Sequence, residues 1–321
     1  MQLVTNSEQQ NRTGIAEFIL LGFGNVEDWN ILLFLLFLAI YIVTLSGNLL
    51  IVGLVIADQH LHTPMYFFLA NLSFLESCYT STILPRMLNS FLMEDKTISL
   101  WGCILQMHFF STLAATECYL LAAMSYDRYL AICRPLHYVT LMNERTCLLL
   151  VSVSWIIGLL LITILTYLLS RLTFCSQYKI DHFFCDFTPL VKLSCSDTWV
   201  IETAAFITSS IGILPTFLIT VTSHVFIIGT ILKIPSFTGR QKAFSTCSSH
   251  LTVVSIFYGS LTFVYILPTT GNFKDINKVF SFLYTVLTPM ANPFIYSLRN
   301  KEVKEAFAKV ICKLVFSHAI H

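Results

Sequence analysis

The sequence predicts an all-α protein: a bundle of seven membrane-spanning helices, with the N-terminus outside and a short amphipathic eighth helix after the last span. Only 12% of the 321 residues are charged and 55% are apolar, whereas a typical soluble domain is about 25% charged. Charge-free windows reach the roughly 20 residues that cross a bilayer, at 29–57, 146–170, 203–232, 243–273 and 279–298. This pattern excludes a soluble multidomain enzyme, a nucleic-acid binder and a disordered chain.

Two further apolar segments each carry one acid in their interior. Pro64–Leu92 contains Glu76, and Cys103–Tyr126 contains Glu117. We therefore expect an outer tail at 1–28, a bundle of seven spans at 29–298 and an inner tail at 299–321. The spans are placed at about 29–57, 64–92, 103–127, 146–170, 203–232, 243–268 and 279–298.

The orientation follows from the distribution of charge between the ends of the spans. With the N-terminus outside, the inner segments hold eleven of the nineteen Lys and Arg residues, in the sense of the positive-inside rule. The first 28 residues lack an apolar signal-peptide core, so we expect the first span to direct insertion. Asn11-Arg12-Thr13 matches a glycosylation acceptor on the outer side.

The ten cysteines divide by expected depth. Cys103, Cys175, Cys185 and Cys195 fall on the outer side, where disulfides persist. Four cysteines allow three pairings, and the sequence alone does not choose between them. A metal site is the rival interpretation, but the spacing does not favour it because no pair forms a CxxC motif and His182 is the only nearby histidine in the loop.

The two acids inside the spans are the strongest single signal of a functional site. At about 1.5 Å per residue, Glu117 lies about 16 Å from the inner end of its span and Glu76 about 18 Å from its own. Carboxylates at matching depth repel each other unless they share a proton or hold a cation such as sodium. Asn48, Ser73 and Asn292 are candidates to complete this central ion or proton site. Two alternatives remain open: protonated acids acting as structural hydrogen-bonding groups and a proton relay.

Three features stand at the inner ends of the spans. Asp127-Arg128-Tyr129 places an acid beside a guanidinium at the end of the third span, and Asn292-Pro293-Phe294-Ile295-Tyr296 places a helix-breaking proline inside the last. Beyond it, 301–315 alternates apolar and cationic residues and predicts the amphipathic helix on the inner membrane face.

In combination these motifs resemble the rhodopsin-like G-protein-coupled receptors, and more narrowly the odorant receptors of the large tetrapod class. The resemblance covers essentially the whole chain. It rests on Gly47-Asn48, the segment Leu61-His62-Thr63-Pro64-Met65-Tyr66-Phe67-Phe68-Leu69, the run from Met124 to Cys133, Pro135-Leu136-His137-Tyr138, the run from Lys242 to Leu251, and the run from Pro289 to Asn300.

The resemblance implies roles for particular residues. It pairs Cys103 with Cys185 and Cys175 with Cys195. It implies that Arg128 contacts a G protein after activation and that Asp127, Tyr129, Asn292, Pro293 and Tyr296 belong to the switch. Ser125, Ser248 and Ala291 differ from the residues usual in the family, and we expect the family's fold to tolerate these differences. His224 replaces a usual tyrosine near Arg128, which puts basal activity in doubt and raises a pH-sensitive signal as a hypothesis.

By similarity, the ligand lies in the outer half of the bundle. For each candidate taken singly, ordinary helix packing is the more frequent role, but as a set they describe an apolar cavity with a few hydroxyls. The candidates are His108, Phe110, Ser111, Ala114, Ile207, Ile211, Tyr258, Leu261, Thr262, Tyr265, Phe282 and Thr285.

We therefore expect a receptor rather than an enzyme, located in the plasma membrane. Without a carboxylate in the outer half of the third span or a lysine in the seventh, the expected ligand is a small, neutral, volatile odorant. Its expected partners are the olfactory stimulatory G protein, which raises cyclic AMP, and membrane lipid, with no nucleic acid. A lipid, metabolite or peptide receptor and a proton-coupled transporter are the alternatives, and the absence of an evident inverted repeat disfavours the transporter.

Overall fold

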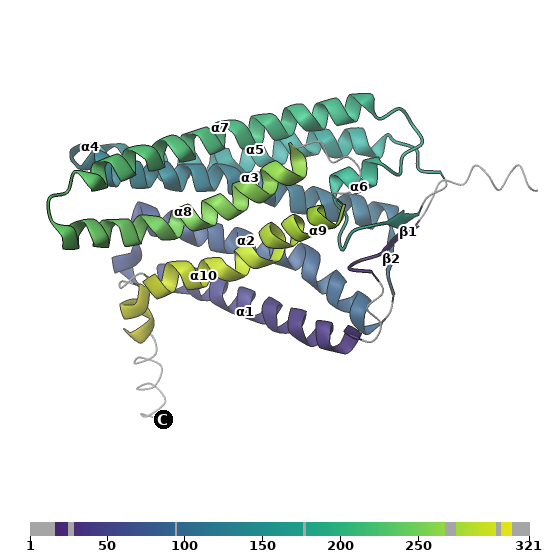
Figure 1. The fold of residues 1–321 in the computed structure, drawn as a ribbon, viewed down its shortest axis with the longest axis horizontal. Coiled ribbons are helices and arrows are strands. Elements are labelled where there is room, and N and C mark those ends of the chain that lie inside the picture. The colour runs from purple at the N-terminus through teal and green to yellow at the C-terminus, as the bar shows by residue number, and fades with distance from the viewer. Residues whose placement is uncertain are drawn as a thin grey trace, which may run out of the picture.

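The computed structural model describes residues 17–24, 29–93, 95–175, 178–266, 274–299 and 303–309. Long helices run side by side along the longest axis of the molecule, and a small sheet lies at one end (Figure 1). That end is called the sheet end below, and the other, which carries Arg128, is called the Arg128 end. Asn11 and the last twelve residues lie outside the described part of the chain.

The long helices follow the apolar segments of the sequence. Their bounds are α1 Asn30–Ala57, α2 Pro64–Leu92, α3 Leu100–Cys133, α5 Glu144–Ser170, α7 Trp199–Leu232 and α8 Phe237–Tyr265. Within the described residues, α1, α5 and α7 are long and apolar enough to cross a membrane, and α8 contributes a shorter apolar stretch, His250–Tyr265. Several helices run past the edges of the apolar windows, because polar residues extend a helix readily where it leaves a bilayer.

The last long element is irregular. It consists of α9 Lys274–Phe282, a π-helical segment Leu283–Leu287 and α10 Thr288–Arg299. The wider π turn leaves Thr288 free to donate its hydroxyl hydrogen to the Leu283 carbonyl, at 3.0 Å. Pro293 lies inside α10, and it removes one backbone hydrogen bond there. Residues 303–309 are again helical.

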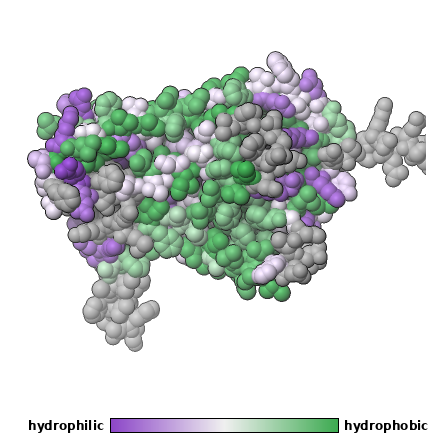
Figure 2. Space-filling view, in the orientation of Figure 1, coloured by the Kyte–Doolittle hydropathy of each residue, from purple (hydrophilic) through white to green (hydrophobic). Residues whose placement is uncertain are grey.

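Apolar side chains cover the middle of the visible surface, while hydrophilic residues gather toward its two ends (Figure 2). Ile31 and Ile56 of α1 are 77% and 73% exposed, and Leu218 and Val225 of α7 are each 62% exposed. A soluble protein rarely exposes so continuous an apolar surface. The distribution is the one that a lipid bilayer requires.

The sheet at the sheet end joins three segments distant in sequence. Strand β1 (Glu17–Leu20) lies between β2 (Thr97–Ser99), with which it pairs antiparallel, and β3 (Lys179–Ile180), with which it pairs parallel. Two disulfides hold the same region, and they are the two pairs that the family resemblance implied. Cys103–Cys185 and Cys175–Cys195 have Cα separations of 5.4 and 6.1 Å.

Two glycines permit close helix contacts. A Cβ atom added at Gly158 of α5 would lie 2.5 Å from the Thr116 Oγ1 atom of α3 and 3.1 Å from the Thr112 carbonyl oxygen. A Cβ atom added at Gly47 of α1 would lie 2.9 Å from Cβ of Pro293 in α10. These contacts fix the positions of α5 and α10 against the rest of the bundle.

Candidate functional site

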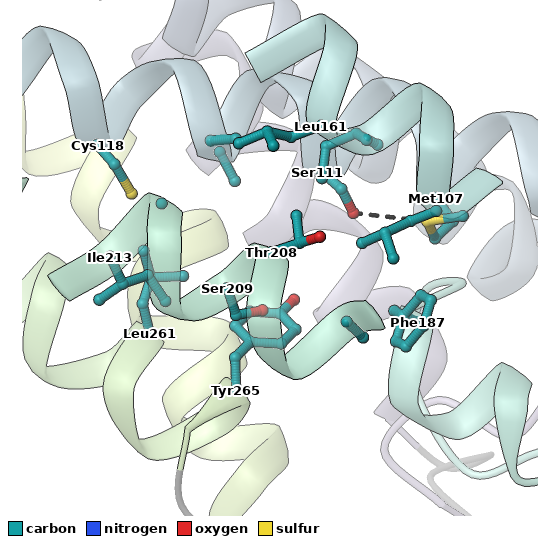
Figure 3. A pocket seen from close by; sticks show the side chains of 16 residues that line it. Met107, Ser111, Cys118, Leu161, Phe187, Thr208, Ser209, Ile213, Leu261 and Tyr265 are labelled. Carbon is teal, nitrogen blue, oxygen red and sulfur yellow. Dashed lines mark hydrogen bonds between the residues drawn. The ribbon is translucent and has the colours of Figure 1, made fainter. Parts of the chain in front are cut away.

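A pocket lies between α3, α5, α7 and α8 in the half of the bundle nearer the sheet end (Figure 3). Its volume is about 90 Å³, against the roughly 10–15 Å³ that one water molecule needs. Its walls are apolar apart from three hydroxyl side chains, a thiol and a phenol. The lining residues are Met107, Ser111, Ala114, Ala115, Cys118, Leu161, Ile162, Leu165, Phe187, Ala205, Thr208, Ser209, Gly212, Ile213, Leu261 and Tyr265.

Four of the residues expected from the sequence line this pocket: Ser111, Ala114, Leu261 and Tyr265. Their positions follow from helix periodicity, because Ser111 and Ala114 are three residues apart on one face of α3. The hydroxyl of Ser111 donates to Sδ of Met107, at 3.6 Å. Two of these four residues come from α3 and two from α8, so both helices contribute to the wall of the cavity.

Other expected residues lie beside the pocket or away from it. Phe110 packs against Phe184 with ring centroids 4.6 Å apart, and His108 Nδ1 lies 2.8 Å from Thr166 Oγ1 on α5. Ile207 and Ile211 are 51% and 50% exposed on the outer surface of α7. Thr262 is half-buried, Tyr258 donates to the Cys118 carbonyl, Phe282 packs on Phe37, and Thr285 donates to the Ser281 carbonyl.

The sequence did not indicate the contribution of α5 or of the loop before α7. Leu161, Ile162 and Leu165 close one side of the pocket, and Phe187 lies at its sheet end. The α5 segment is uniformly apolar, so its periodicity does not show which side faces the protein. Phe187 opens the short helix α6 (Phe187–Val191), whose place against the pocket depends on tertiary structure.

A buried carboxyl group lies beside this pocket. Asp186 precedes α6 and is 2% exposed, and its Oδ1 accepts hydrogen bonds of 2.8 Å from the Phe187 N–H and from the Tyr265 hydroxyl. The Tyr265 oxygen lies 2.9 Å from the Tyr284 hydroxyl. Burial raises the pKa of Asp186 to about 6, although both hydrogen bonds favour the charged form. Nothing in the sequence marks this carboxylate, because Asp186 lies in a loop outside the apolar spans.

The loop around Asp186 covers the sheet end of the pocket. His182 is 4% exposed and packs against the rings of Phe183 and Phe184, with centroids 4.7 and 4.6 Å away. Burial, with the nearby Lys278 charge, lowers the pKa of His182 to about 3, so the ring is neutral at physiological pH. Lys278 itself pairs with Asp181 at 2.5 Å. The loop that covers the pocket is therefore packed with aromatic rings and held by the Lys278–Asp181 ion pair.

The two acids expected inside the bundle are both completely buried, and they lie close enough to interact electrostatically. Asn292 Nδ2 donates a short hydrogen bond to Glu76 Oε1. Asn48 Nδ2 donates to the carbonyls of Thr44 and Pro289, each at 3.1 Å. Among the described residues no hydrogen-bond partner is found for Glu76 Oε2, Glu117 Oε1 and Oε2, Asn48 Oδ1 and Asn292 Oδ1.

At the Arg128 end, the expected acid–guanidinium pair is formed. Arg128 Nη2 lies 2.5 Å and Nε 3.0 Å from Asp127 Oδ2. Tyr129 packs on Phe226 of α7, with centroids 5.8 Å apart. Pro293 contacts α1 at Gly47, and the side chain of Tyr296 lies outside the described part of the structure.

Comparison with known proteins identifies the family. A model of the olfactory receptor family matches residues 37–314. Human olfactory receptor 6N1 is 50% identical over 304 residues, which are 95% of this chain and 97% of the relative. Human olfactory receptor 6C3 is 47% identical over 306 residues, covering 95% and 98%, and gorilla olfactory receptor 1G1 is 48% identical over 304 residues, covering 95% and 97%.

The chain belongs to the olfactory receptor family. It is therefore a multi-pass membrane protein of a family of G-protein-coupled receptors, which are not enzymes. The matched residues of this olfactory receptor include the pocket, the buried carboxylates and the Asp127–Arg128 pair.

In this olfactory receptor a pair of histidines lies near the switch residues. His224 of α7 and His250 of α8 are each 4% exposed, and His224 Nε2 lies 3.2 Å from His250 Nδ1. His224 Nδ1 lies 2.7 Å from the Thr220 carbonyl. Since a carbonyl only accepts, His224 carries its proton on Nδ1, and its Nε2 accepts from His250. The sequence singled out His224, but its partner appears only when α7 and α8 pack together.

Proposed function

We propose that this receptor binds a small, neutral, volatile odorant in the pocket between α3, α5, α7 and α8, and that binding activates the olfactory stimulatory G protein and raises cyclic AMP. The observation that carries the proposal is the pocket itself, which is apolar and lined by a few polar groups in the manner of small-molecule sites. Only ligands that partition readily into apolar surroundings suit such walls.

The proposed topology has seven membrane spans, with the N-terminus and the sheet end outside. The spans are α1, α2, α3, α5, α7, α8 and the combined segment from α9 to α10. Two disulfides at the sheet end support this orientation, since disulfides persist in oxidising compartments. Glycosylation at Asn11 and an amphipathic helix around residues 303–309 on the inner face belong to the same proposal.

Activation is proposed as a shift between two arrangements of the bundle. Ligand contacts at Ser111 and Tyr265 bias the relative position of α3 and α8, which both line the pocket. The same two helices carry Arg128 (α3) and His250 (α8) toward the opposite end, so each helix links the pocket to a residue near the switch. The ligand shifts the equilibrium only by its difference in affinity for the two states. Opening of the Asp127–Arg128 pair then exposes Arg128 to the G protein.

A sodium ion or a shared proton is proposed at the central carboxylates. The oxygens without hydrogen-bond partners among the described residues belong to Glu76, Glu117, Asn48 and Asn292, and oxygen ligands suit a hard cation. These side chains would hold the ion, and its positive charge would offset the repulsion between the two carboxylates. Because they come from α1, α2, α3 and α10, occupation would stabilise one arrangement of four helices.

The experiment is an odorant screen in cells that express the full chain together with the olfactory G protein. We expect neutral volatiles to raise cyclic AMP, and Leu261→Trp, which fills the pocket, to abolish that response while surface expression is retained. A control, Ile207→Trp, places the same side chain on the exposed surface of α7 and should leave the response unchanged. A panel in which only amines or carboxylates act as agonists would overturn the proposed ligand class.

A further inference from the structure

The pocket between α3, α5, α7 and α8 is open to the exterior of the protein rather than enclosed. Part of its wall is therefore accessible, and several of the residues that form this wall are only half-buried. On α3, α5 and α7 these residues are Ser111, Ala115, Leu161, Ala205, Thr208 and Ser209. The position of the opening decides how a ligand reaches the pocket.

At the sheet end, the pocket is covered by a cluster of packed apolar side chains. Met107 and Phe187 belong both to the wall of the pocket and to this cluster, which continues to Phe18 of β1 and Ile180 of β3. The cluster also contains five side chains that are no more than 3% exposed, namely Ile104, Leu169, Leu190, Val191 and Ile201. The Cys103–Cys185 disulfide lies in the same cluster. A ligand that entered from this end would have to separate a packed core.

The wall of the pocket at α8 is held by hydrogen bonds. Tyr265 donates to Asp186 Oδ1 at 2.8 Å, and its oxygen lies 2.9 Å from the Tyr284 hydroxyl. Asp186 is 2% exposed and Tyr284 is fully buried. These bonds tie α8 both to the segment that precedes α6 and to the π-helical segment, so this side of the pocket is closed by buried groups.

The packing between α5 and α7 is more open. Both helices contribute to the sheet-end cluster, but closer to the Arg128 end one face of α7 carries only small residues, three or four positions apart: Ala205, Thr208, Ser209 and Gly212. Gly212 is buried and lines the pocket, yet a Cβ atom added there would meet nothing within 4 Å. The backbone of α7 therefore borders empty space. We call this opening, between Leu161 and Leu165 of α5 and Ala205, Thr208 and Gly212 of α7, the α5–α7 fissure.

The α5–α7 fissure leads to α3. Ser111, Ala115 and Tyr119 are spaced four residues apart, so they lie on one side of α3, and all three are half-buried. The Tyr119 hydroxyl lies 3.5 Å from the Ile211 carbonyl oxygen of α7, so Tyr119 bridges the two helices at the Arg128 end of the fissure. Figure 3 shows Leu161 and Thr208 facing the cavity from two different helices.

The surface around the α5–α7 fissure is apolar. Leu160 and Ile164 of α5 are 59% and 58% exposed, and Ile211 of α7 is 50% exposed. Neither 146–170 nor 203–232 contains Asp, Glu, Lys or Arg. In a membrane such a surface is covered by acyl chains, where neutral apolar molecules accumulate because the removal of their surface from water is favourable.

We propose that odorants enter the pocket sideways from the lipid bilayer, through the α5–α7 fissure. This inference rests on the proposed odorant-binding function and adds a route and a filter to it. The molecules admitted are uncharged, dissolve in the bilayer and are narrow enough to pass between Leu161 and Thr208. Charged compounds are rejected at the fissure before they meet the pocket.

The route is tested by labelling a cysteine placed in the pocket, which requires no known agonist. The probe is butyl methanethiosulfonate, a neutral thiol reagent that dissolves in lipid, and the protein is the full-length Ser111→Cys receptor in phosphatidylcholine nanodiscs. Mass spectrometry gives the rate of labelling at position 111. Adding Gly212→Leu narrows the fissure and should slow labelling on the order of tenfold, because crowding raises the barrier to passage. Adding Leu161→Ala widens the fissure and should speed labelling.

Two variants in the same background and one native thiol serve as controls. Gly229→Leu adds the same side chain at an exposed position of α7 with nothing within 4 Å, and should leave the rate unchanged. Lys278→Met removes the ion pair with Asp181 in the loop over the pocket, and should also leave the rate unchanged. Cys78, a half-buried free cysteine, should react equally fast in every variant, which excludes a general loosening of the fold.

The outcomes separate this inference from the proposed function. Faster labelling in Lys278→Met places the entrance at the sheet end and overturns the inference. Rates that do not respond to Gly212→Leu and Leu161→Ala also overturn it, while odorant activation in cells stands. Labelling that follows the width of the fissure, without any odorant response in cells, supports the route and contradicts the proposed signalling. Leu161→Ala keeps the test decisive if Gly212→Leu does not fold.

Discussion

Tyr138 donates a hydrogen bond of 2.9 Å to Oδ1 of Asp127, the carboxylate whose other oxygen pairs with Arg128. Tyr138 belongs to α4 (Pro135–Leu141), the short helix that follows α3. Asp127 is 1% exposed, so both of its oxygens are bonded within the protein. The helix after α3 thereby holds the acid that restrains Arg128.

Removing the Tyr138 hydroxyl should loosen this restraint. We expect Tyr138→Phe to raise basal cyclic AMP about two- to tenfold, because a typical hydrogen bond contributes about 0.5–1.5 kcal/mol. The Tyr126→Phe variant, at a 38% exposed tyrosine of the same helix end, is the control and should leave basal signalling unchanged. Normal basal activity in the Tyr138→Phe receptor would show that the Tyr138 hydroxyl does not restrain Arg128.

The contact between α3 and α5 at Gly158 should tolerate no side chain. Gly158→Ala places a methyl group 2.5 Å from Thr116 Oγ1 and 3.1 Å from a backbone oxygen, and overpacking of this kind costs about 1–3 kcal/mol. Thermal unfolding of purified receptor should show the loss. Gly229→Ala is the control, because nothing lies within 4 Å of the added atom. Thr116→Ala in the Gly158→Ala background should restore part of the stability.

The buried carboxyl of Asp186 should make stability depend on pH. Its pKa is raised from 3.8 to about 6 by burial, so ionisation opposes folding, and the stability it contributes is lost as pH rises from about 4 to above 6. The shift corresponds to about 3 kcal/mol. Relative to wild type, Asp186→Asn should therefore gain melting temperature as pH rises from 4.5 to 7.

Two other titrating groups bear on this comparison, and one of them, Asp95, tests its sign. His182, whose pKa is lowered, gives the opposite slope, but it is common to wild type and Asp186→Asn and cancels in the difference. Asp95, an exposed acid whose pKa is lowered by hydrogen bonds from Thr97, stabilises the receptor above its unfolded pKa. Asp95→Asn should lose melting temperature relative to wild type as pH rises. A pH-independent difference for Asp186→Asn would contradict the burial of a titrating carboxyl.

Replacing His224 should change signalling at the Arg128 end. His224→Tyr removes the acceptor of the His250 N–H and restores the residue that the family resemblance led us to expect. We expect basal and stimulated cyclic AMP to change by at least twofold, with the response to pH reduced. His60→Tyr, at an exposed histidine, is the control. Unchanged signals in His224→Tyr would show that the histidine pair has no part in activation.

The central carboxylates should respond to sodium. In wild type we expect sodium chloride to raise the melting temperature of purified receptor above its value in N-methylglucamine chloride at equal ionic strength. Glu117→Gln removes one charge and its repulsion toward Glu76, so this difference should vanish while overall stability rises or stays level. Asp58→Asn, an acid near Lys309, is the control. A sodium effect that persists in Glu117→Gln would place the ion elsewhere.

The sequence predicted those features that depend on composition or local periodicity. The long helices, the buried Glu76 and Glu117, and the Asp127–Arg128 pair were all evident from apolar windows and isolated charges. The orientation of residues on uniformly apolar helices was not evident, because no polar residues show which face of the helix points away from the protein. Ile207 and Ile211 turn outward, while Leu161 and Leu165 line the pocket. Asp186 and His250 gained their roles only through packing between distant segments.

The position of β1 at the centre of the sheet has a practical consequence for protein engineering. Backbone hydrogen bonds link Leu20 to Lys96 on one side and Leu21 to Ile180 on the other, so residues 17–21 join the two connecting loops in addition to the Cys103–Cys185 disulfide. Epitope tags and fusion partners should be placed before Glu17. A deletion that extends into residues 17–20 would remove these backbone hydrogen bonds and leave the two loops joined by the Cys103–Cys185 disulfide.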